Sequence, residues 1–136
     1  MSEGTREEYR ILLVDDEPDV VEALANTLRR AKEFAATVDT ATTADEALDR
    51  LGERTYHLVL ADHRMPGTPG IDLLARVAQS HPDVVRALIT GYTDLDIALE
   101  AVDKARVHYY VQKPWDNEEL RVTVREALKG AWKAKL

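Results

Sequence analysis

The sequence predicts a single α/β domain built as a doubly wound parallel sheet. Short apolar runs alternate along the chain with segments in which apolar residues recur every three or four positions, and this alternation is typical of strands joined by helical crossovers. The chain has 136 residues, of which 45% are hydrophobic, enough for one domain with one sizeable core. We expect an ordered domain over residues 10–131, a mobile polar tail over 1–9, and a C-terminal tail or the start of a linker over 132–136.

Five apolar runs are the expected strands. They centre on residues 11–14, 36–40, 57–61, 84–89 and 107–111. The second run is short and half polar, which favours a less buried position at the edge of the sheet. Because helical segments separate the runs, we expect the strands to pair in parallel.

Five segments with helical periodicity follow the expected strands, one after each. Their apolar stripes consist of Val21, Leu24 and Leu28; Ala44, Ala47, Leu48 and Leu51; Leu74, Val77 and Ala78; Leu95, Ala98, Leu99 and Val102; and Leu120, Val124, Ala127 and Leu128. Each stripe can lie on one face of a sheet. Residues that favour a helix start open four of these segments: Pro18, Thr43 or Asp45, Asp94, and Asp116 with Glu119. Right-handed crossovers would then cover both faces of the sheet.

The composition excludes several classes of protein. Asp and Glu total 25 against 18 Lys and Arg, a formal net charge of −7, which disfavours direct binding to nucleic acid or to an anionic membrane surface. The chain has no cysteine, which excludes disulfides and thiolate metal sites. It also has no long apolar stretch that would indicate a signal peptide or a membrane span. We therefore expect a cytoplasmic protein without membrane insertion.

Polar residues of complementary charge stand at the ends of four expected strands. Asp15 and Asp16 follow the first run, Asp62 the third, Thr90 the fourth and Lys113 the fifth. Ligands of open parallel sheets bind outside the carboxyl ends of the strands, so these side chains should share one edge. Two carboxylates about 4 Å apart repel each other by roughly 1–4 kcal/mol. Mg²⁺, which prefers carboxylate and phosphate oxygens, would offset that repulsion, and the lack of His and Cys at these strand ends argues against zinc.

Asp62 is the expected nucleophile. A carboxylate can accept a phosphoryl group as an aspartyl phosphate, and this transfer needs mainly positioning and charge neutralisation. Asp62 follows the most continuously apolar strand and precedes a loop over residues 65–70 that is rich in Pro and Gly and can bring backbone groups close. Lys113 would pair with a phosphoryl oxygen. Thr90 would donate its hydroxyl to that oxygen, and Gly91 would leave room for the approach.

Each of these residues has a simpler interpretation when taken alone. Asp15 and Asp16 could equally be helix-capping residues, and Asp62 a turn former. Thr90 could be a strand-end hydroxyl and Lys113 part of a solvated turn. Their joint occurrence at successive strand ends favours a functional site. The four histidines show no ligand spacing, and we interpret them as structural or exposed.

Four segments together resemble the receiver domain of bacterial two-component response regulators, a CheY-like domain. They are residues 13–18 (LVDDEP), 62–70 (DHRMPGTPG), 88–94 (LITGYTD) and 110–114 (YVQKP). They occur in the family's order and spacing, and the resemblance covers about residues 9–130. It implies a flavodoxin-like fold whose five-stranded parallel sheet has the order 2-1-3-4-5.

The resemblance also implies a function in phosphorelay signal transduction and a set of site residues. Asp62 would accept a phosphoryl group from a sensor histidine kinase or a phosphotransfer protein. The domain would catalyse only its own phosphorylation and dephosphorylation, so it is not an enzyme in the usual sense. Asp16 would bind Mg²⁺ directly, with Asp15 nearby through water or a weaker contact. Asp62 and the backbone carbonyl of Arg64 would complete the metal ligands.

Thr90 and Tyr110 would form the switch pair. The resemblance implies that the threonine moves toward the phosphoryl group and that the aromatic ring follows inward. Packing would then change on the face made by the fourth helix, the fifth strand and the fifth helix. That face would control an output domain outside this chain or a separate partner, and it would also allow a homodimer.

The resemblance also places Arg64 and Tyr92 at the two positions that vary between receivers and that tune how long the phosphoryl group lasts. Both side chains are bulky. Our hypothesis is that they restrict the attacking water and lengthen the lifetime of the phosphorylated state.

Two other functions compete with this one. A pseudo-receiver would be an interaction module that no longer accepts phosphoryl, but this chain retains every acidic, threonine and lysine position. A flavin-binding protein of similar topology needs a phosphate loop after the first strand, where residues 15–18 (DDEP) would instead repel a phosphate.

Overall fold

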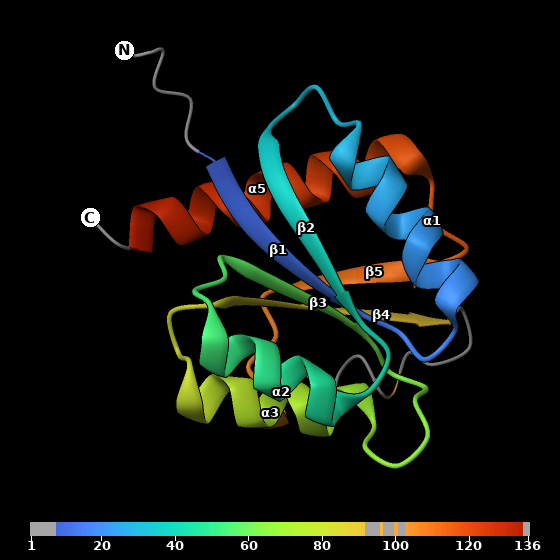
Figure 1. The fold of residues 1–136 in the computed structure, drawn as a ribbon, viewed down its shortest axis with the longest axis vertical. Helices are drawn as coiled ribbons and strands as arrows, with labels where there is room; N and C mark the ends of the chain where they lie inside the picture. The colour runs from blue at the N-terminus through green and yellow to red at the C-terminus, as the bar shows by residue number, and fades with distance from the viewer. Residues whose placement is uncertain (1–7, 92–95, 97–99, 101–102, 135–136) are drawn as a thin grey trace.

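A five-stranded parallel sheet forms the centre of the molecule in the computed structural model, which describes residues 8–91, 96, 100 and 103–134. The strand order is β2-β1-β3-β4-β5, and each neighbouring pair is parallel (Figure 1). The elements are β1 (Glu8–Val14), α1 (Pro18–Arg29), β2 (Ala35–Ala41), α2 (Ala44–Glu53), β3 (Leu58–Asp62), α3 (Gly70–Ser80), β4 (Val85–Gly91), β5 (Tyr109–Lys113) and α5 (Asn117–Ala134). The predicted fold class and strand order are confirmed.

The strands coincide with the five apolar runs, and the half-polar second run forms β2 at the edge of the sheet. β1 begins at Glu8 and α5 ends at Ala134, two and three residues outside the range expected for the ordered domain. Glu8 pairs with Ala35 of β2 through the backbone, and such pairing needs no apolar side chain. The fourth expected helix lies mainly outside the described residues.

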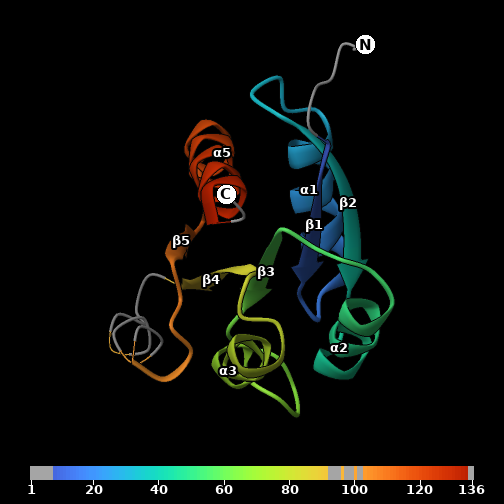
Figure 2. The ribbon, with the colours of Figure 1, turned by 90° about the vertical axis from the view of Figure 1, so that its left-hand side faces the viewer.

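Two helical layers enclose the sheet. α1 and α5 cover one face, and α2 and α3 cover the other (Figures 1 and 2). Because side chains alternate along a strand, Leu58 and Leu60 of β3 belong to the core under α1 and α5, whereas Val59 and Ala61 belong to the core under α2 and α3. A fully buried leucine contributes about 1.5–3 kcal/mol. This two-sided burial fixes β3, and with it the position of the residue at its end.

The helix starts follow the sequence signals. Pro18 opens α1. The hydroxyl oxygen of Thr43 accepts the backbone N–H of Glu46 over 3.0 Å, and the carboxylate of Glu46 accepts the N–H of Thr42 over 2.8 Å, which is a capping box displaced by one residue. At α5, Asp116 accepts the N–H of Glu119 over 2.9 Å. Asp94 lies outside the described residues.

Two histidines extend the sheet where its strands begin, which we call the amino end. His57 donates its N–H to the carbonyl of Arg10 over 2.8 Å and accepts the N–H of Arg10 on its ring Nδ1 over 3.0 Å. His108 makes the same two bonds with Arg86, over 2.8 and 3.0 Å. Each ring therefore accepts a backbone N–H of the neighbouring strand, β1 or β4, at a position just before the pairing strand begins. No helix among the described residues is long and apolar enough to cross a membrane.

Candidate functional site

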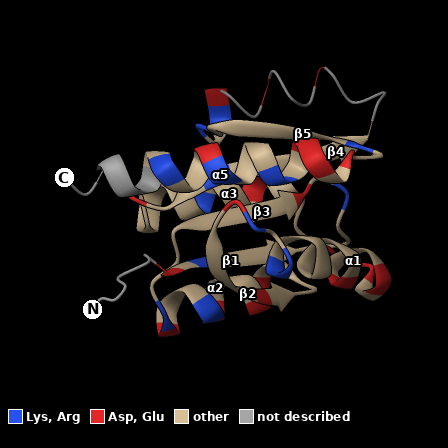
Figure 3. Ribbon diagram, turned by 90° about the horizontal axis from the view of Figure 1, so that it is seen from above, with Lys and Arg blue, Asp and Glu red and all other residues tan. Residues whose placement is uncertain are grey.

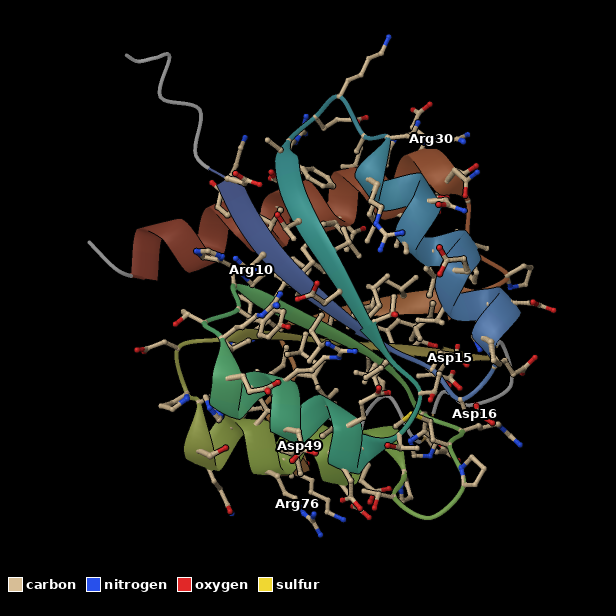
Figure 4. All side chains as sticks on the ribbon, in the orientation of Figure 1. Arg10, Asp15, Asp16, Arg30, Asp49 and Arg76 are labelled. Atoms are coloured by element: carbon tan, nitrogen blue, oxygen red, sulfur yellow. The ribbon has the colours of Figure 1, made fainter. Side chains whose placement is uncertain are left out.

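Three aspartates meet at the opposite end of the sheet, which we call the carboxyl end. Asp15 and Asp16 follow β1 and Asp62 ends β3, and these two strands are neighbours, with Val14 opposite Ala61. One carboxylate oxygen from each aspartate lies within 4.8 Å of the other two. Figure 4 labels Asp15 and Asp16 at the far end of β1 from Arg10. The structure thus brings together the carboxylates that the sequence places at successive strand ends.

Two of the three aspartates are held away from solvent. Asp15 is fully buried, Asp62 is 4% exposed and Asp16 is half-buried. The backbone N–H of Asp15 donates to the carbonyl of Ala41 over 3.1 Å, and its Oδ1 accepts the N–H of Glu17 over 3.0 Å. Asp16 is therefore the most accessible carboxylate of the three.

Lys113 supplies the positive charge next to the aspartates. Its Nζ lies 3.0 Å from Oδ1 of Asp62 and 3.4 Å from Oδ2 of Asp15. Lys113 ends β5, two strands away from β3 in the sheet. Lys113 thus contacts two of the three carboxylates, and these four side chains together carry an excess of negative charge when all three aspartates are ionised.

The electrostatics of the cluster raise the pKa of Asp62. Burial is the largest cause, and the charges of Asp15 and Asp16 act in the same direction, against the hydrogen bond and the charge of Lys113. Burial by itself would lower the pKa of Lys113, but the hydrogen bond with Asp62 and the nearby negative charges raise it. The site therefore destabilises the ionised form of Asp62 and stabilises the protonated ammonium form of Lys113.

Gly70 allows helix α3 to begin directly against the backbone of Asp62. A Cβ atom at Gly70 would collide with the carbonyl oxygen of Asp62 and would lie 2.9 Å from the Cα of His63. The N–H of Gly70 also donates to the carbonyl of His63 over 2.9 Å. The close backbone approach that the Pro- and Gly-rich loop suggested is thus located at its last residue. The sequence alone did not distinguish Gly70 from Gly67.

The two expected switch residues differ in exposure. Thr90 is 1% exposed, and it follows Ile89, the residue of β4 that pairs with Asp62. Tyr110 on β5 is 38% exposed and lines a groove of about 270 Å³ together with Trp115. In this conformation the tyrosine ring is at the surface, so the inward position would require it to move.

The remaining expected site residues are Arg64 and Tyr92. Arg64, two residues after Asp62, is exposed. Tyr92 lies outside the described residues. Acidic residues also occupy the first turns of α1 and α5 (Figure 3), with Asp19 in the first helix and Glu118 and Glu119 in the second. These charges add to the negative potential of the carboxyl end, which favours a cation.

The donor set at the carboxyl end fits Mg²⁺. All three side chains offer carboxylate oxygens, at separations within 4.8 Å. Mg²⁺ usually takes one or two carboxylates directly and keeps several waters, so these three carboxylates are enough to hold it. The charges match as well, because a divalent cation would offset the excess carboxylate charge beside Lys113.

Comparison with known proteins places the chain in a family context. The family model of the response regulator receiver domain matches residues 11–125. The hydrogenase transcriptional regulatory protein HoxA of Cupriavidus necator is 39% identical over 120 residues, which is 88% of this chain and 24% of that protein. The response regulator protein PilR of Pseudomonas aeruginosa is 39% identical over 122 residues, 88% of this chain and 26% of that protein. The chain therefore spans about a quarter of the length of these relatives.

Solved structures agree with the sequence relatives. The crystal structure of the signal receiver domain of an HD domain-containing protein from Pseudomonas fluorescens Pf-5 has a TM-score of 0.86 at 33% identity, covering 96% of this chain and 92% of that one. The receiver domain of NtrX from Brucella abortus has a TM-score of 0.81 at 28% identity, covering 88% of this chain and 98% of that one. Both matches extend over nearly the whole sheet and its helices.

Proposed function

Because the chain belongs to the family of response regulator receiver domains, which act in phosphorelay signalling, we propose that Asp62 is its phosphoacceptor. The observation that carries this proposal is the contact of a nearly buried Asp62 with Lys113, over 3.0 Å, beside Asp15 and Asp16. The pKa of Asp62 is raised, with burial as the largest cause. It also ends the central, fully buried strand.

The proposed reaction is a phosphoryl transfer. A carboxylate oxygen of Asp62 forms a bond to phosphorus, and the bond from phosphorus to a ring nitrogen of the donor's phosphohistidine breaks, so that the histidine leaves with the electron pair. The phosphoryl group carries roughly 1.5 to 2 negative charges at neutral pH, in place of the single charge of the carboxylate. Lys113 already lies 3.0 Å from Oδ1 of Asp62 and would pair with a phosphoryl oxygen instead. Thr90 would donate its hydroxyl to the same group.

We propose that Asp15, Asp16, Asp62 and the backbone carbonyl of Arg64 hold the Mg²⁺ of this site. The ion, when bound, would neutralise charge on the phosphoryl oxygens as transfer proceeds. Asp16 is the direct ligand in this proposal because it is more accessible than Asp15. Asp15, fixed by its loop and by Lys113, would act through water.

The proposed output of phosphorylation is a packing change at the surface around Tyr110. Thr90 would move toward the phosphoryl group, and Tyr110 would leave the groove that it shares with Trp115. The added charge at one residue would thus shift the balance between two conformations of this surface. The bulky Arg64 and Tyr92 would limit access of water and lengthen the phosphorylated lifetime. The double substitution of both residues by alanine should then speed autodephosphorylation, and an unchanged rate would reject this role.

The partners are proposals too. A sensor histidine kinase or phosphotransfer protein would supply the phosphoryl group. HoxA, a transcriptional regulatory protein, and PilR, a response regulator protein, are each about four times as long as the aligned region. An output domain linked to α5, or a homodimer through the surface around Tyr110, would therefore receive the signal. A pseudo-receiver is disfavoured because Asp62, Thr90 and Lys113 are all retained.

Beryllofluoride, a stable mimic of the phosphoryl group on aspartate, tests this proposal. With Mg²⁺ it should shift the amide resonances near Asp62, Thr90 and Lys113 in the ¹⁵N-labelled chain. Asp62→Asn should eliminate these shifts, whereas Asp49→Asn, an exposed carboxylate of α2, should not. An equal response from Asp62→Asn and the unmodified chain would reject Asp62 as the acceptor.

A further inference from the structure

A charged residue lies inside the apolar run that forms β4. Arg86 is 4% exposed, and its position in the strand places its side chain on the same face as Val84 and Leu88, which belong to the core under α2 and α3. Burial of a guanidinium without compensating bonds is costly. An arginine in this position therefore indicates a contact that the fold depends on.

The guanidinium bonds to main-chain carbonyls from two parts of the chain. Its Nη1 donates to the carbonyl of Val84 over 2.9 Å and to that of Pro82 over 3.3 Å, both just before β4. Its Nε donates to the carbonyl of Ala105 over 3.2 Å and to that of Arg106 over 3.4 Å, both before β5. Among the described residues, Arg86 thus joins the start of β4 to the turn that leads into β5.

That turn is held in an unusual conformation. Arg106 has a φ of +49°, a region that costs energy for a residue with a side chain. Ala105 is fully buried, and Lys104 pairs with Asp72 of α3 over 2.6 Å. The bonds from Arg86 reach the carbonyls on both sides of the strained position, which explains how the turn persists.

We propose that Arg86 is a positioning residue that fixes the turn at Ala105 and Arg106 to the start of β4. When the conformation near Tyr110 changes, this turn stays in place and the chain beyond it moves. The part of the proposal that concerns change rests on the proposed phosphorylation at Asp62. Burial, together with the charge of Arg106, lowers the pKa of Arg86, but the guanidinium remains charged at neutral pH. Its hydrogen bonds to carbonyls are therefore charge-assisted.

Amide hydrogen exchange of the full chain tests the fixed turn without any phosphoryl mimic. Arg86→Met introduces an apolar side chain of similar length and removes every hydrogen-bond donor of the arginine side chain. The amides of Ala105, Arg106 and His108 should then exchange at least about tenfold faster, while those of β1 keep their rates. Arg76→Met, at an exposed position of α3, is the matched control and should change none of them. If Arg86→Met does not fold, Arg86→Lys decides, because one ammonium cannot reach both pairs of carbonyls and exchange at the turn should still rise.

Beryllofluoride with Mg²⁺ tests the pivot. In the unmodified chain the amides of Ala105 and Arg106 should shift less than that of Tyr110, and in the Arg86 variant the shifts should spread into the turn. Equal shifts at Arg106 and Tyr110 in the unmodified chain, or unchanged exchange at the turn in the Arg86 variants, would overturn the proposal. Absence of any shift near Asp62 would reject the proposed function instead, and the exchange result would still decide whether Arg86 fixes the turn.

Discussion

The two ends of the sheet differ in how their buried charged groups are compensated. At the carboxyl end, Asp15, Asp16 and Asp62 lie close together, Lys113 contacts Asp15 and Asp62, and the pKa of Asp62 is raised. At the amino end, Arg86 is buried, but four carbonyls accept its hydrogen bonds.

The difference separates polar groups that stabilise the fold, at the amino end, from polar groups that are arranged to react, at the carboxyl end. At the amino end, histidine rings accept backbone N–H groups and a guanidinium donates to carbonyls, so these polar groups have hydrogen-bond partners. The carboxyl end tolerates repulsion between carboxylates, which a cation or a phosphoryl group can use. Substitutions at the two ends should therefore have opposite effects on stability and function.

The largest expected effect is that of Asp62→Asn at the carboxyl end. Phosphorylation should become undetectable because the nucleophilic carboxylate is lost. The fold should nevertheless gain stability, by about 0.5–2 kcal/mol in the metal-free protein at neutral pH, since the carboxylate with the raised pKa is removed and Lys113 keeps Asp15. Urea unfolding measures the gain, and a clear loss of stability would contradict the account of this end.

Asp16→Asn should have the next largest effect, on metal binding. Loss of the most accessible carboxylate should weaken Mg²⁺ by about tenfold or more and abolish phosphorylation with it, whereas Asp62→Asn should weaken Mg²⁺ only partly. Titration calorimetry of both variants separates the two roles. Equal losses of Mg²⁺ affinity in both would contradict the assignment of Asp16 as the direct ligand.

Near the amino end, Tyr56→Phe should only destabilise. The hydroxyl of Tyr56 donates to Oδ2 of Asp39 over 2.6 Å, and burial, with that acceptor, raises the pKa of Tyr56 to about 12. Removing the hydroxyl leaves the charged acceptor without one donor, at a cost of about 1.5–3 kcal/mol. Phosphorylation should keep its rate. A rate change larger than the stability change would show that the two ends are coupled.

The smallest expected effect is a pH dependence at His108. Partial desolvation of its ring, followed by the charge of Arg86, lowers the pKa of His108 in the folded protein, although the residue as a whole is exposed. The unfolded chain, with an ordinary value of about 6.5, takes up a proton first as the pH falls, so the free energy of unfolding should decrease below about pH 6.5. Asp62 acts in the opposite sense, because its raised pKa in the folded protein favours protonation of the folded state in acid.

Urea unfolding from pH 7.5 to 5 should show this decrease. His108→Asn removes the titration, and its stability should change less over the same range. If the unmodified chain and this variant lose stability equally between pH 6.5 and 5, His108 is not the cause.

Most of the fold could be predicted from sequence because it follows from periodicity. The apolar runs located the strands, and helical stripes between them required parallel pairing. The strand ends located the three aspartates and Lys113 because all parallel strands finish at the same edge.

The amino end could not be predicted in the same way. Arg86 bonds to carbonyls 19 and 20 residues away, and His57 bonds to Arg10, 47 residues earlier. Such contacts depend on how the crossovers place loops, which local patterns do not encode. The one available signal was an arginine within an apolar run. The exposure of Tyr110 on β5 was equally hidden, because strand alternation does not specify which rotamer a side chain adopts.

Mapping the phosphorylated residue tests the central claim most directly. The chain would be treated with Mg²⁺ and a small phosphodonor such as acetyl phosphate, then with borohydride, which reduces an acyl phosphate to an alcohol, and the modified peptide would be identified by mass spectrometry. We predict reduction of Asp62 alone, at a level that depends on Mg²⁺ and is lost in Asp62→Asn. Modification at Asp15 or Asp16, or none at all while Mg²⁺ is bound, would contradict the account.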